Sequence, residues 1–499
     1  MKKDKSHIAF LNPQGNFDSK DSYWTQHPDF GGQLVYVKEV AMAVARLGHR
    51  VDILARRIVD PEWPEFAAPL DGYPGVQNVR IVRLACGPEH FLPKEELWPH
   101  LGPEWVPNIL AFYRGEGKLP DAFTAHYADG GLAGALLKKE TGIPFTFTGH
   151  SLGAQKLDKL GVTPETLAEI DVRFRFARRI FAERVSMNHA ACIITSTTQE
   201  RLEQYAHPAY AGAAQPDHEA RFAIIPPGVN RRVFTPAPGP QDAAIQRRVS
   251  AALERDIAES RRQLPLVIAS SRLESKKNHI GLVRAFALSK DLQASANLAI
   301  VVRGLEDPLR QYQAMSSGER AIMDEITALM QAHHLWGKVT AFPLNSQAEL
   351  AAAYRYLARR RSVFCLTALY EPFGLAPLEA MSCGLPAVVT HSGGPSESLQ
   401  EDGHTFGILV DPGDPDDIAR GLMQALGSEK AWKHLQEAGI QRVLSRYTWE
   451  RTAEGYLGVI EAMLKGPARK GGLPIPEYFT NPTPDRDIPL SDLAALYFG

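Results

Sequence analysis

The sequence predicts an α/β protein with two doubly wound domains. The 499 residues exceed the roughly 250 to 300 at which a single core stops growing. Short β-branched runs alternate with longer helical patterns, and near-continuous apolar strands separated by helices are typical of parallel sheets covered on both faces. This alternation starts again near residue 264, which indicates a second domain of the same class.

The expected strands fall into two series. Those of the first half occupy residues 7–11, 50–55, 79–85, 122–128, 144–150, 191–197 and 222–228. Those of the second half occupy residues 264–273, 297–304, 338–344, 362–368, 385–390 and 407–411. The clearest helix follows Gly31 and Gly32 and ends at Gly48. Its buried face repeats at the spacing of one helical stripe: Val37, Val40, Ala41, Val44 and Leu47.

A proline-rich and glycine-rich stretch at about residues 226–241 marks the domain boundary. We expect an N-terminal domain at residues 1–235, a C-terminal domain at 236–445, and a final helix and arm at 446–499 that pack back on the N-terminal domain. Open α/β sheets bind ligands at the carboxyl ends of their strands, so the active site is expected in a cleft between two facing domains.

Composition excludes several partners. Lysine plus arginine number 55 against 57 acidic residues, which gives no global attraction to nucleic acid or an anionic membrane. Neither a signal peptide nor a membrane-spanning run is evident, so we expect a cytoplasmic protein. The scattered cysteines form no CxxC pair and are expected as buried free thiols: Cys86, Cys192, Cys365 and Cys383.

Two basic residues follow the first strand of the second half. Arg272 and Lys277, in "SRLESKKN", lie across a strand-to-helix turn, where both can converge on a diphosphate; a solvated charged loop is the alternative. Gly31 and Gly32 open a helix whose N-terminus favours an anion, although a simple turn explains them as well. The sequence has no GxGxxG or GxxxxGK[ST], which disfavours a nicotinamide oxidoreductase and a Walker-type ATPase.

The first half supplies a histidine and a basic cluster. His150 ends a strand, where it meets a sugar hydroxyl or serves only as a structural residue. In "DVRFRFARRIFAER", Arg175, Arg178 and Arg179 are expected on one helical face. Together with Lys94 and Lys156 they can grip a phosphate, although such a face is often merely solvated.

Glu371 and Glu379 are separated by seven residues in "YEPFGLAPLEA". In one helix their carboxylates would lie roughly 12 Å apart, too far for an acid/base pair of the glycosidase kind at about 6.5 to 9.5 Å. Pro372 and Gly374 instead place Glu371 on a loop, with a helix starting near Ala376 or Pro377. The two glutamates are therefore expected to contact two parts of one ligand.

These motifs resemble the retaining nucleotide-sugar glycosyltransferases with two facing Rossmann-like domains, the GT-B fold. "NPQGNFD", "HPDFGGQLVYVKE", "FLPKEELWP", "TGHSLGAQK" and "LNSQAELAAAY" resemble the sucrose-phosphate synthases within that group. The resemblance covers nearly the whole chain. It implies retaining transfer of glucose from UDP-glucose, or another nucleoside-diphosphate glucose, to fructose 6-phosphate, which gives sucrose 6-phosphate.

The resemblance also implies site residues. The catalytic set would be His150, Arg272, Lys277 and Glu371. The donor would be bound by Gly32, Leu344, Asn345, Phe373, Gly374, Leu375 and Glu379. The acceptor would be bound by Gly31, Gln33, Lys94, Tyr127, Lys156, Arg178 and Arg179. In that scheme Glu379 holds the ribose, Glu371 the glucosyl hydroxyls, and Arg272 and Lys277 the diphosphate.

No carboxylate stands out as a covalent nucleophile, so a front-face substitution is favoured in which the leaving diphosphate takes the acceptor's proton. No metal or other cofactor is expected to be required, with Mg²⁺ at most non-essential. The DxD strings at 414–416 and 485–487 lie in proline-bounded turns and are interpreted as caps.

Several alternatives stay open at this stage. Sucrose synthase would use free fructose, and mannosylfructose-phosphate synthase would use a mannosyl donor with the same phosphate grip. A silent sugar-binding module would have lost Arg272, Lys277 or Glu371, all of which are present. No phosphatase-like domain follows, so a separate phosphatase is expected to consume the product.

Overall fold

The computed structural model describes residues 5–24, 32–467, 469 and 471–499. It divides into two units, one made of residues 1–226 with 449–499 and the other of residues 227–448. The boundaries expected from the sequence lay at 235 and 445. The chain thus leaves the first unit at Pro226 and returns to it at Trp449, through the α18 helix.

The first unit holds an eight-stranded sheet in the order β3-β4-β2-β1-β5-β6-β7-β8. All neighbours pair in parallel except β3 with β4. Its strands are β1 (His7–Leu11), β2 (Arg50–Arg56), β3 (Leu70–Asp71), β4 (Val79–Leu84), β5 (Ala122–His126), β6 (Phe145–Thr148), β7 (Cys192–Thr195) and β8 (Phe222–Ile224). Its helices are α1 (Gly32–Arg46), α2 (Trp98–His100), α3 (Val106–Gly115), α4 (Tyr127–Thr141), α5 (Gly153–Lys159), α6 (Leu167–Phe174), α7 (Phe176–His189), α18 (Trp449–Lys465) and α19 (Leu490–Phe498).

The second unit holds a six-stranded parallel sheet in the order β11-β10-β9-β12-β13-β16. Its strands are β9 (Leu266–Ala269), β10 (Asn297–Val302), β11 (Val339–Pro343), β12 (Val363–Leu366), β13 (Ala387–Thr390) and β16 (Ile408–Val410), with the small pair β14 (Gln400–Glu401) and β15 (His404–Thr405). Its helices are α8 (Asp242–Asp256), α9 (His279–Leu288), α10 (Lys290–Ser295), α11 (Pro308–Gln311), α12 (Ser317–Ala332), α13 (Gln347–Arg359), α14 (Leu375–Ser382), α15 (Pro395–Ser398), α16 (Pro415–Leu426) and α17 (Glu429–Arg446).

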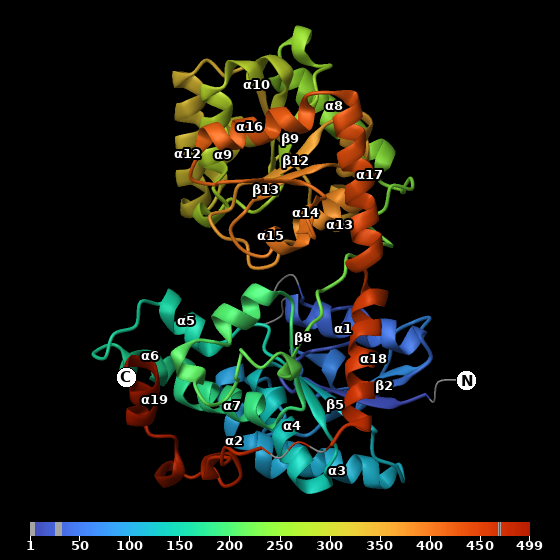
Figure 1. The fold of residues 1–499 in the computed structure, drawn as a ribbon, viewed down its shortest axis with the longest axis vertical. Coiled ribbons are helices and arrows are strands. Elements are labelled where there is room, and N and C mark those ends of the chain that lie inside the picture. The colour runs from blue at the N-terminus through green and yellow to red at the C-terminus, as the bar shows by residue number, and fades with distance from the viewer. Residues whose placement is uncertain (1–4, 25–31, 468, 470) are drawn as a thin grey trace. The chain divides into compact units, whose positions relative to one another are not determined.

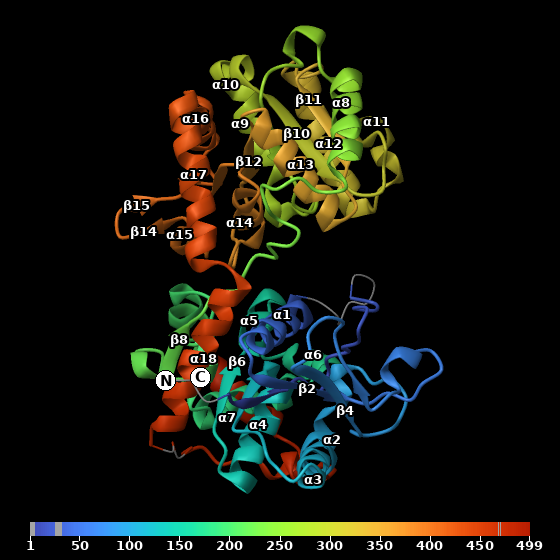
Figure 2. The ribbon, with the colours of Figure 1, turned by 90° about the vertical axis from the view of Figure 1, so that its right-hand side faces the viewer.

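Each expected strand is present, and the predicted fold class is confirmed. The strands are largely buried because helices cover both faces; β1, for example, is buried along its whole length. In the first unit, α18 lies beside α1 although hundreds of residues separate them (Figure 1). Figure 2 shows α4 and α7 close together in the same unit. The two-residue strands β3, β14 and β15 were not expected, because a strand of two residues is too short to show an alternating hydrophobic pattern.

The long helix after Gly32 largely matches the prediction. Val37, Val40 and Val44 are buried, and Gly48 adopts a φ of +93° just beyond the end of the helix. Leu47 is 36% exposed, so its assignment to the buried face is wrong: α1 ends at Arg46, and the turn carries Leu47 away from the stripe. All four cysteines are buried and free, as expected.

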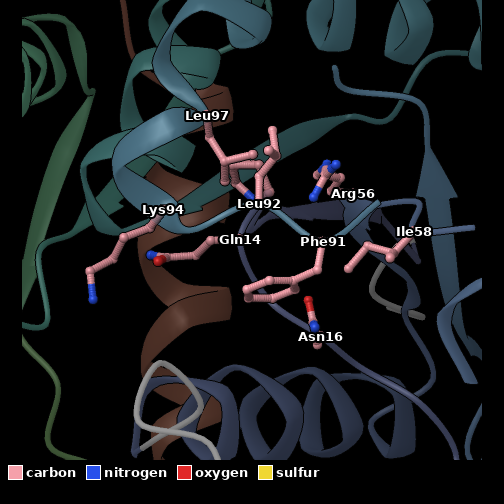
Figure 3. A pocket seen from close by; sticks show the side chains of 9 residues that line it. Gln14, Asn16, Arg56, Ile58, Phe91, Leu92, Lys94 and Leu97 are labelled. Carbon is pink, nitrogen blue, oxygen red and sulfur yellow. The ribbon is translucent and has the colours of Figure 1, made fainter. Parts of the chain in front are cut away.

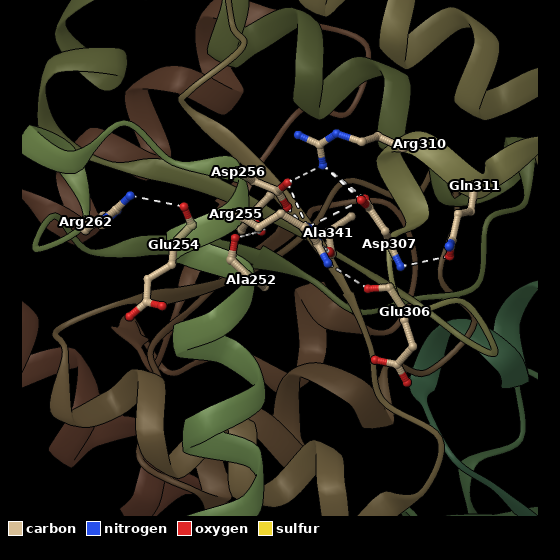
Figure 4. Close-up of polar contacts among 11 residues, drawn as sticks. Ala252, Glu254, Arg255, Asp256, Arg262, Glu306, Asp307, Arg310, Gln311 and Ala341 are labelled. Atoms are coloured by element: carbon tan, nitrogen blue, oxygen red, sulfur yellow. Dashed lines mark hydrogen bonds and ion pairs between the residues drawn. The ribbon is translucent and has the colours of Figure 1, made fainter.

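An ion-pair network ties α8 to its neighbours in the second unit (Figure 4). Asp256, almost fully buried, binds Arg255 at 2.7 Å, Arg310 of α11 at 2.8 Å and the Thr340 hydroxyl of β11 at 2.8 Å. Several donors hold the pKa of this carboxyl below its usual value against the opposing effect of burial. The contacts fix α8 and α11 on the edge strand β11, which we interpret as a structural role.

Candidate active site

The carboxyl ends of β9, β10 and β11 open onto a cavity of about 850 Å³ in the second unit. This volume lies within the range of sites that hold small molecules and cofactors. The wall is supplied by the turns after these strands and by the start of α12. It includes Ser270, Ser271, Arg272, Glu274, Val302, Arg303, Ser316, Glu319, Leu344 and Gln347.

Lys277 and Glu371 form a preset charge pair in this unit. Lys277 closes the short turn after β9, and Glu371 lies on the loop after β12. Their Nζ and Oε2 atoms are 2.7 Å apart, with side chains 17% and 14% exposed. The Glu371 carbonyl accepts the Gly394 N–H at 2.9 Å, and a Cβ on Gly393 would lie 2.1 Å from that carbonyl. The glycine is therefore needed where this loop packs closely.

Arg272 is placed differently. It lines the cavity with a side chain that is 71% exposed, and its Nη1 lies 2.7 Å from Glu274. Lys276 binds the same carboxylate at 2.9 Å. The Lys276 hydrogen bond is the largest effect that holds the pKa of Glu274 below its usual value, and nearby positive charges add to it. An anion that enters the cavity therefore competes with Glu274 for Arg272.

Glu379 lies on α14, which begins at Leu375 after Gly374 with a φ of +90°. The expected start near Ala376 or Pro377 was one or two residues late. Burial raises the pKa of Glu379 to about 7. Burial raises the pKa of Tyr354, and the charge of Glu379 adds to this effect; the Tyr354 hydroxyl bonds Ser270 in the cavity wall at 2.7 Å. Glu371 thus lies on a loop and Glu379 on the helix that follows it, as predicted, and their contact with two parts of one ligand stays a prediction.

Three further residues of the predicted donor set lie after neighbouring strands of the second sheet, Leu344 and Asn345 after β11 and Phe373 on the loop after β12. Leu344, 4% exposed, lines the cavity after β11. Asn345 accepts the Gly304 N–H through Oδ1 at 3.2 Å and donates its own N–H to Glu349 at 2.7 Å. Phe373 is half-buried against Tyr447, with ring centroids 6.1 Å apart.

A small basic pocket in the first unit gathers three of the predicted acceptor residues, Lys94, Tyr127 and Arg179. Its complete lining is Lys94, Glu95, Trp98, Tyr127, Asp129, Phe174 and Arg179. Lys156 reaches the same wall, since its Nζ lies 4.4 Å from the centroid of the Phe174 ring. An adjoining hollow shares Lys94 and presents Gln14, whose buried Nε2 has no partner among the described residues (Figure 3).

Arg179 is held rigidly. Its Nε donates to Glu183 at 2.9 Å and its Nη2 to the Ser151 carbonyl at 2.7 Å, while its guanidinium lies 4.6 Å from the Tyr127 ring centroid. Glu183 is fully buried and also accepts the Gly153 N–H at 3.0 Å and the Tyr210 hydroxyl. A buried cation with its own carboxylate is therefore already oriented at the pocket.

The expectation that Arg175, Arg178 and Arg179 share one helical face is wrong. Arg175 has a φ of +52°, which breaks the helix between α6 and α7. Arg178 instead makes a bidentate ion pair with Asp487, at 3.0 and 2.6 Å, and is not among the residues that line the pocket.

The two DxD strings lie at helix ends. Asp414 caps α16 by accepting the N–H groups of Asp416 and Asp417, which confirms the cap interpretation of the first string. Asp487 of the second string occupies the C-cap position of the 3-10 helix at Pro484–Arg486, accepts the Ile488 N–H at 2.9 Å and also pairs with Arg178.

The remaining predicted residues lie at the start of α1 or just after β6. His150 has a φ of +57°, and burial lowers its pKa to about 3. Gln33 donates through Nε2 to Asn12 at 3.2 Å. Gly32 opens α1, and Gly31 lies outside the described residues.

Sequence reasoning missed Asp129 and Glu183. Asp129 lines the basic pocket, burial raises its pKa to about 7, and its Oδ2 is buried without a partner among the described residues. The available signal was its position three residues after the end of β5, the same logic that selected Arg272. Glu183 gave no signal, because only tertiary packing reveals its partners.

Across residues 5–24, 32–467, 469 and 471–499, no group of three or more His, Cys, Asp or Glu side chains could hold a metal ion. Within the same ranges, no helix is long and apolar enough to span a membrane.

Known proteins share both halves of this chain. Residues 31–211 match the model of the glycosyl transferase 4-like domain, and residues 251–442 match that of glycosyl transferases group 1. A probable sucrose-phosphate synthase of Thermosipho melanesiensis is 43% identical over 95% of this chain and 98% of its own length. A probable sucrose-phosphate synthase of Oryza sativa is 30% identical over 94% of this chain, which spans 53% of that relative.

Among solved structures, the sucrose-phosphate synthase of Thermosynechococcus elongatus matches with a TM-score of 0.61 and 25% identity, over 92% of this chain and 99% of that one. The catalytic domain of starch synthase IV from Arabidopsis thaliana, at 14% identity and a TM-score of 0.58 over 93% of this chain and all of that one, shares the fold. The chain therefore belongs to the sucrose-phosphate synthase family of GT-B glycosyltransferases.

Proposed function

We propose that the protein transfers glucose from UDP-glucose, or another nucleoside-diphosphate glucose, to fructose 6-phosphate with retention, and releases sucrose 6-phosphate and the nucleoside diphosphate. The observation that carries this proposal is the basic pocket of the first unit. Lys94 and Arg179 line it, and Lys156 lies against its Phe174 wall. Two or three cations suit the phosphate of a phosphorylated acceptor, whereas free fructose carries no negative charge for them to bind.

The donor fits the second unit. Glu379 would accept hydrogen bonds from the ribose, and Glu371 from the glucosyl hydroxyls. Arg272 and Lys277 would face the diphosphate, on which negative charge grows as the glycosidic bond breaks, so their attraction is stronger in the transition state than in the ground state. The leaving phosphate would take the proton of the attacking hydroxyl. These two cations supply the stabilisation that a metal could otherwise provide, and we propose no metal requirement.

On the acceptor side, Asp129 offers a buried oxygen without a partner among the described residues, which suits a hydroxyl of fructose 6-phosphate. We further propose that the protein acts in the cytoplasm and that its product passes to a separate phosphatase, since sucrose 6-phosphate still carries its phosphate. An assay for free phosphate with the purified protein and sucrose 6-phosphate checks the second point.

The decisive experiment is the release of UDP from UDP-glucose with fructose 6-phosphate or fructose, in the presence and absence of EDTA, with the product identified by mass and chromatography. We expect release only with fructose 6-phosphate, and no loss with EDTA. Release with free fructose would indicate sucrose synthase instead, and release only from GDP-mannose would indicate the mannosyl enzyme.

A matched pair of variants sharpens this test. Lys94→Ala should raise the KM for fructose 6-phosphate about tenfold, because one charge-assisted hydrogen bond is lost. Lys118→Ala removes a lysine with a 69% exposed side chain in the same unit and should leave that KM unchanged. Equal effects of the two substitutions would contradict the assignment of the pocket.

A further inference from the structure

Two histidines meet at the carboxyl ends of β5 and β6 in the first unit. His126 is the last residue of β5, and His150 follows β6 by two residues. Nδ1 of His126 lies 2.9 Å from Nε2 of His150. Burial lowers the pKa of both imidazoles, so both rings are neutral at physiological pH. In such a pair one nitrogen donates and the other accepts.

Neighbouring threonines favour one direction. The Thr146 hydroxyl donates to the Thr124 hydroxyl at 2.8 Å. Thr124 is then free to donate its own hydrogen to Nε2 of His126, 3.4 Å away. When Nε2 of His126 accepts this hydrogen, the ring hydrogen of His126 lies on Nδ1 and is donated to Nε2 of His150. His150 must then carry its own hydrogen on Nδ1.

Packing holds both rings in this arrangement. Phe10 stacks on His126 at 5.4 Å with an interplanar angle of 5°. Tyr36 meets the His150 ring edge-on at 5.0 Å, and its hydroxyl bonds that of Tyr456 at 3.1 Å. His150 itself keeps a positive φ, which is costly for a residue with a side chain and is typical of functional sites.

We propose that His126 is a positioning residue that holds His150 in the Nδ1–H tautomer, so that His150 presents a hydrogen-bond donor to a hydroxyl oxygen of the transferred sugar. This rests on the proposed function, which assigns His150 to that sugar. No described residue pairs with Nδ1 of His150 in the hydrogen bonds of the structure, so that donor is left for a ligand. In the opposite tautomer His150 would present an acceptor there, and a different hydroxyl orientation would be selected.

The test uses the full chain labelled with ¹⁵N-histidine. Imidazole nitrogens with and without hydrogen differ in ¹⁵N chemical shift, and the His150→Asn variant identifies the His150 signals. We expect hydrogen on Nδ1 of His150 in the ligand-free wild type. Hydrogen on Nε2 would overturn the inference, whereas wild-type release of UDP with fructose 6-phosphate would still support the proposed function.

Variants then separate positioning from packing. His126→Phe keeps an aromatic ring but donates nothing, and should lose the His150 tautomer preference and lower kcat about tenfold, with the KM for fructose 6-phosphate unchanged. His126→Asn places an amide donor near the position of Nδ1 and should recover most of the tautomer preference and of kcat. A matched control is His189→Phe in the same unit, where His189 bonds the Leu473 carbonyl at 2.8 Å; it should leave the His150 signal unchanged. An unchanged His150 tautomer in His126→Phe would overturn the positioning role, whatever the loss of thermal stability.

Discussion

Arg179 of the first unit and Arg272 of the second are placed in opposite ways. In the first unit Arg179 has a side chain only 6% exposed, and the buried carboxylate of Glu183 fixes its orientation. In the second unit Arg272 is 71% exposed and shares Glu274 with Lys276. Under the proposed function the acceptor's phosphate keeps its charge throughout the reaction, so a rigid binding site suits this phosphate. The donor's diphosphate gains charge and then departs, which suits a solvated cation whose partner can be exchanged.

The largest effect is expected in the first unit, where Arg179 is rigidly held, as a loss of stability. Glu183→Gln leaves the buried Arg179 without its counter-charge, and we expect the free energy of unfolding of the first unit to fall by about 3 to 5 kcal/mol. Thermal unfolding of the full chain should show this as a loss of several degrees in the transition of that unit. Glu169→Gln, at an exposed position on α6, provides the matched control and should change nothing. Unaltered thermal stability in Glu183→Gln would mean that the orientation of Arg179 does not depend on this pair.

The second unit should lose activity rather than stability. Lys277→Ala should lower kcat about 100-fold, because one cation that faces the developing charge of the leaving diphosphate is lost. Lys276→Ala is the matched control, since this adjacent lysine is 65% exposed and binds only Glu274 among the ion pairs of the structure; we expect less than a twofold change. Steady-state kinetics with saturating fructose 6-phosphate separates the two. Equal losses in both variants would indicate a general electrostatic effect of this turn.

The same contrast explains what the sequence could predict. The strands and the α1 helix can be predicted from the period of the hydrophobic residues. The turn after β9 can be predicted from its position at the carboxyl end of a strand, so Arg272 and Lys277 could be selected as site candidates from the sequence. The break at Arg175 was not, because the apolar and basic spacing runs unchanged through it and only its positive φ separates α6 from α7. The pairing of Arg178 with Asp487 was equally hidden, since these residues are 309 positions apart in the sequence. The sequence alone thus predicts well which strand ends carry charged residues, but it predicts poorly which residues those charges pair with.

Glu379 should show a stability effect whose sign depends on pH. Its pKa in the folded protein is about 7 against an ordinary value of 4.5, so the folded state holds this proton more tightly than the unfolded chain. The folded state therefore loses stability as pH rises from about 4.5 to about 7, and above pH 7 the ionised, half-buried carboxylate carries the full desolvation cost.

Glu379→Gln removes that cost. We expect it to stabilise the second unit by about 1 to 3 kcal/mol at pH 8 and hardly at all at pH 5, while it raises the KM for UDP-glucose. Thermal unfolding of both proteins across this pH range is the measurement, and Glu437→Gln, with a side chain 66% exposed on α17, is the control without a comparable trend. A variant less stable than wild type at pH 8 would contradict burial as the cause of the raised pKa.

The smallest effect concerns the exchangeable partner of Arg272. Glu274→Gln should tighten UDP binding about twofold at low salt, because the competing carboxylate is lost, and the gain should vanish at high salt since exposed charge pairs are screened. Glu319→Gln removes the same charge from the same cavity wall, but Glu319 binds Ser316 in a capping box instead of Arg272. Calorimetric titration of both variants with UDP isolates the contact from the overall potential. If Glu319→Gln tightens UDP binding as much as Glu274→Gln, the net charge of the cavity governs affinity and the release of Arg272 from Glu274 contributes nothing.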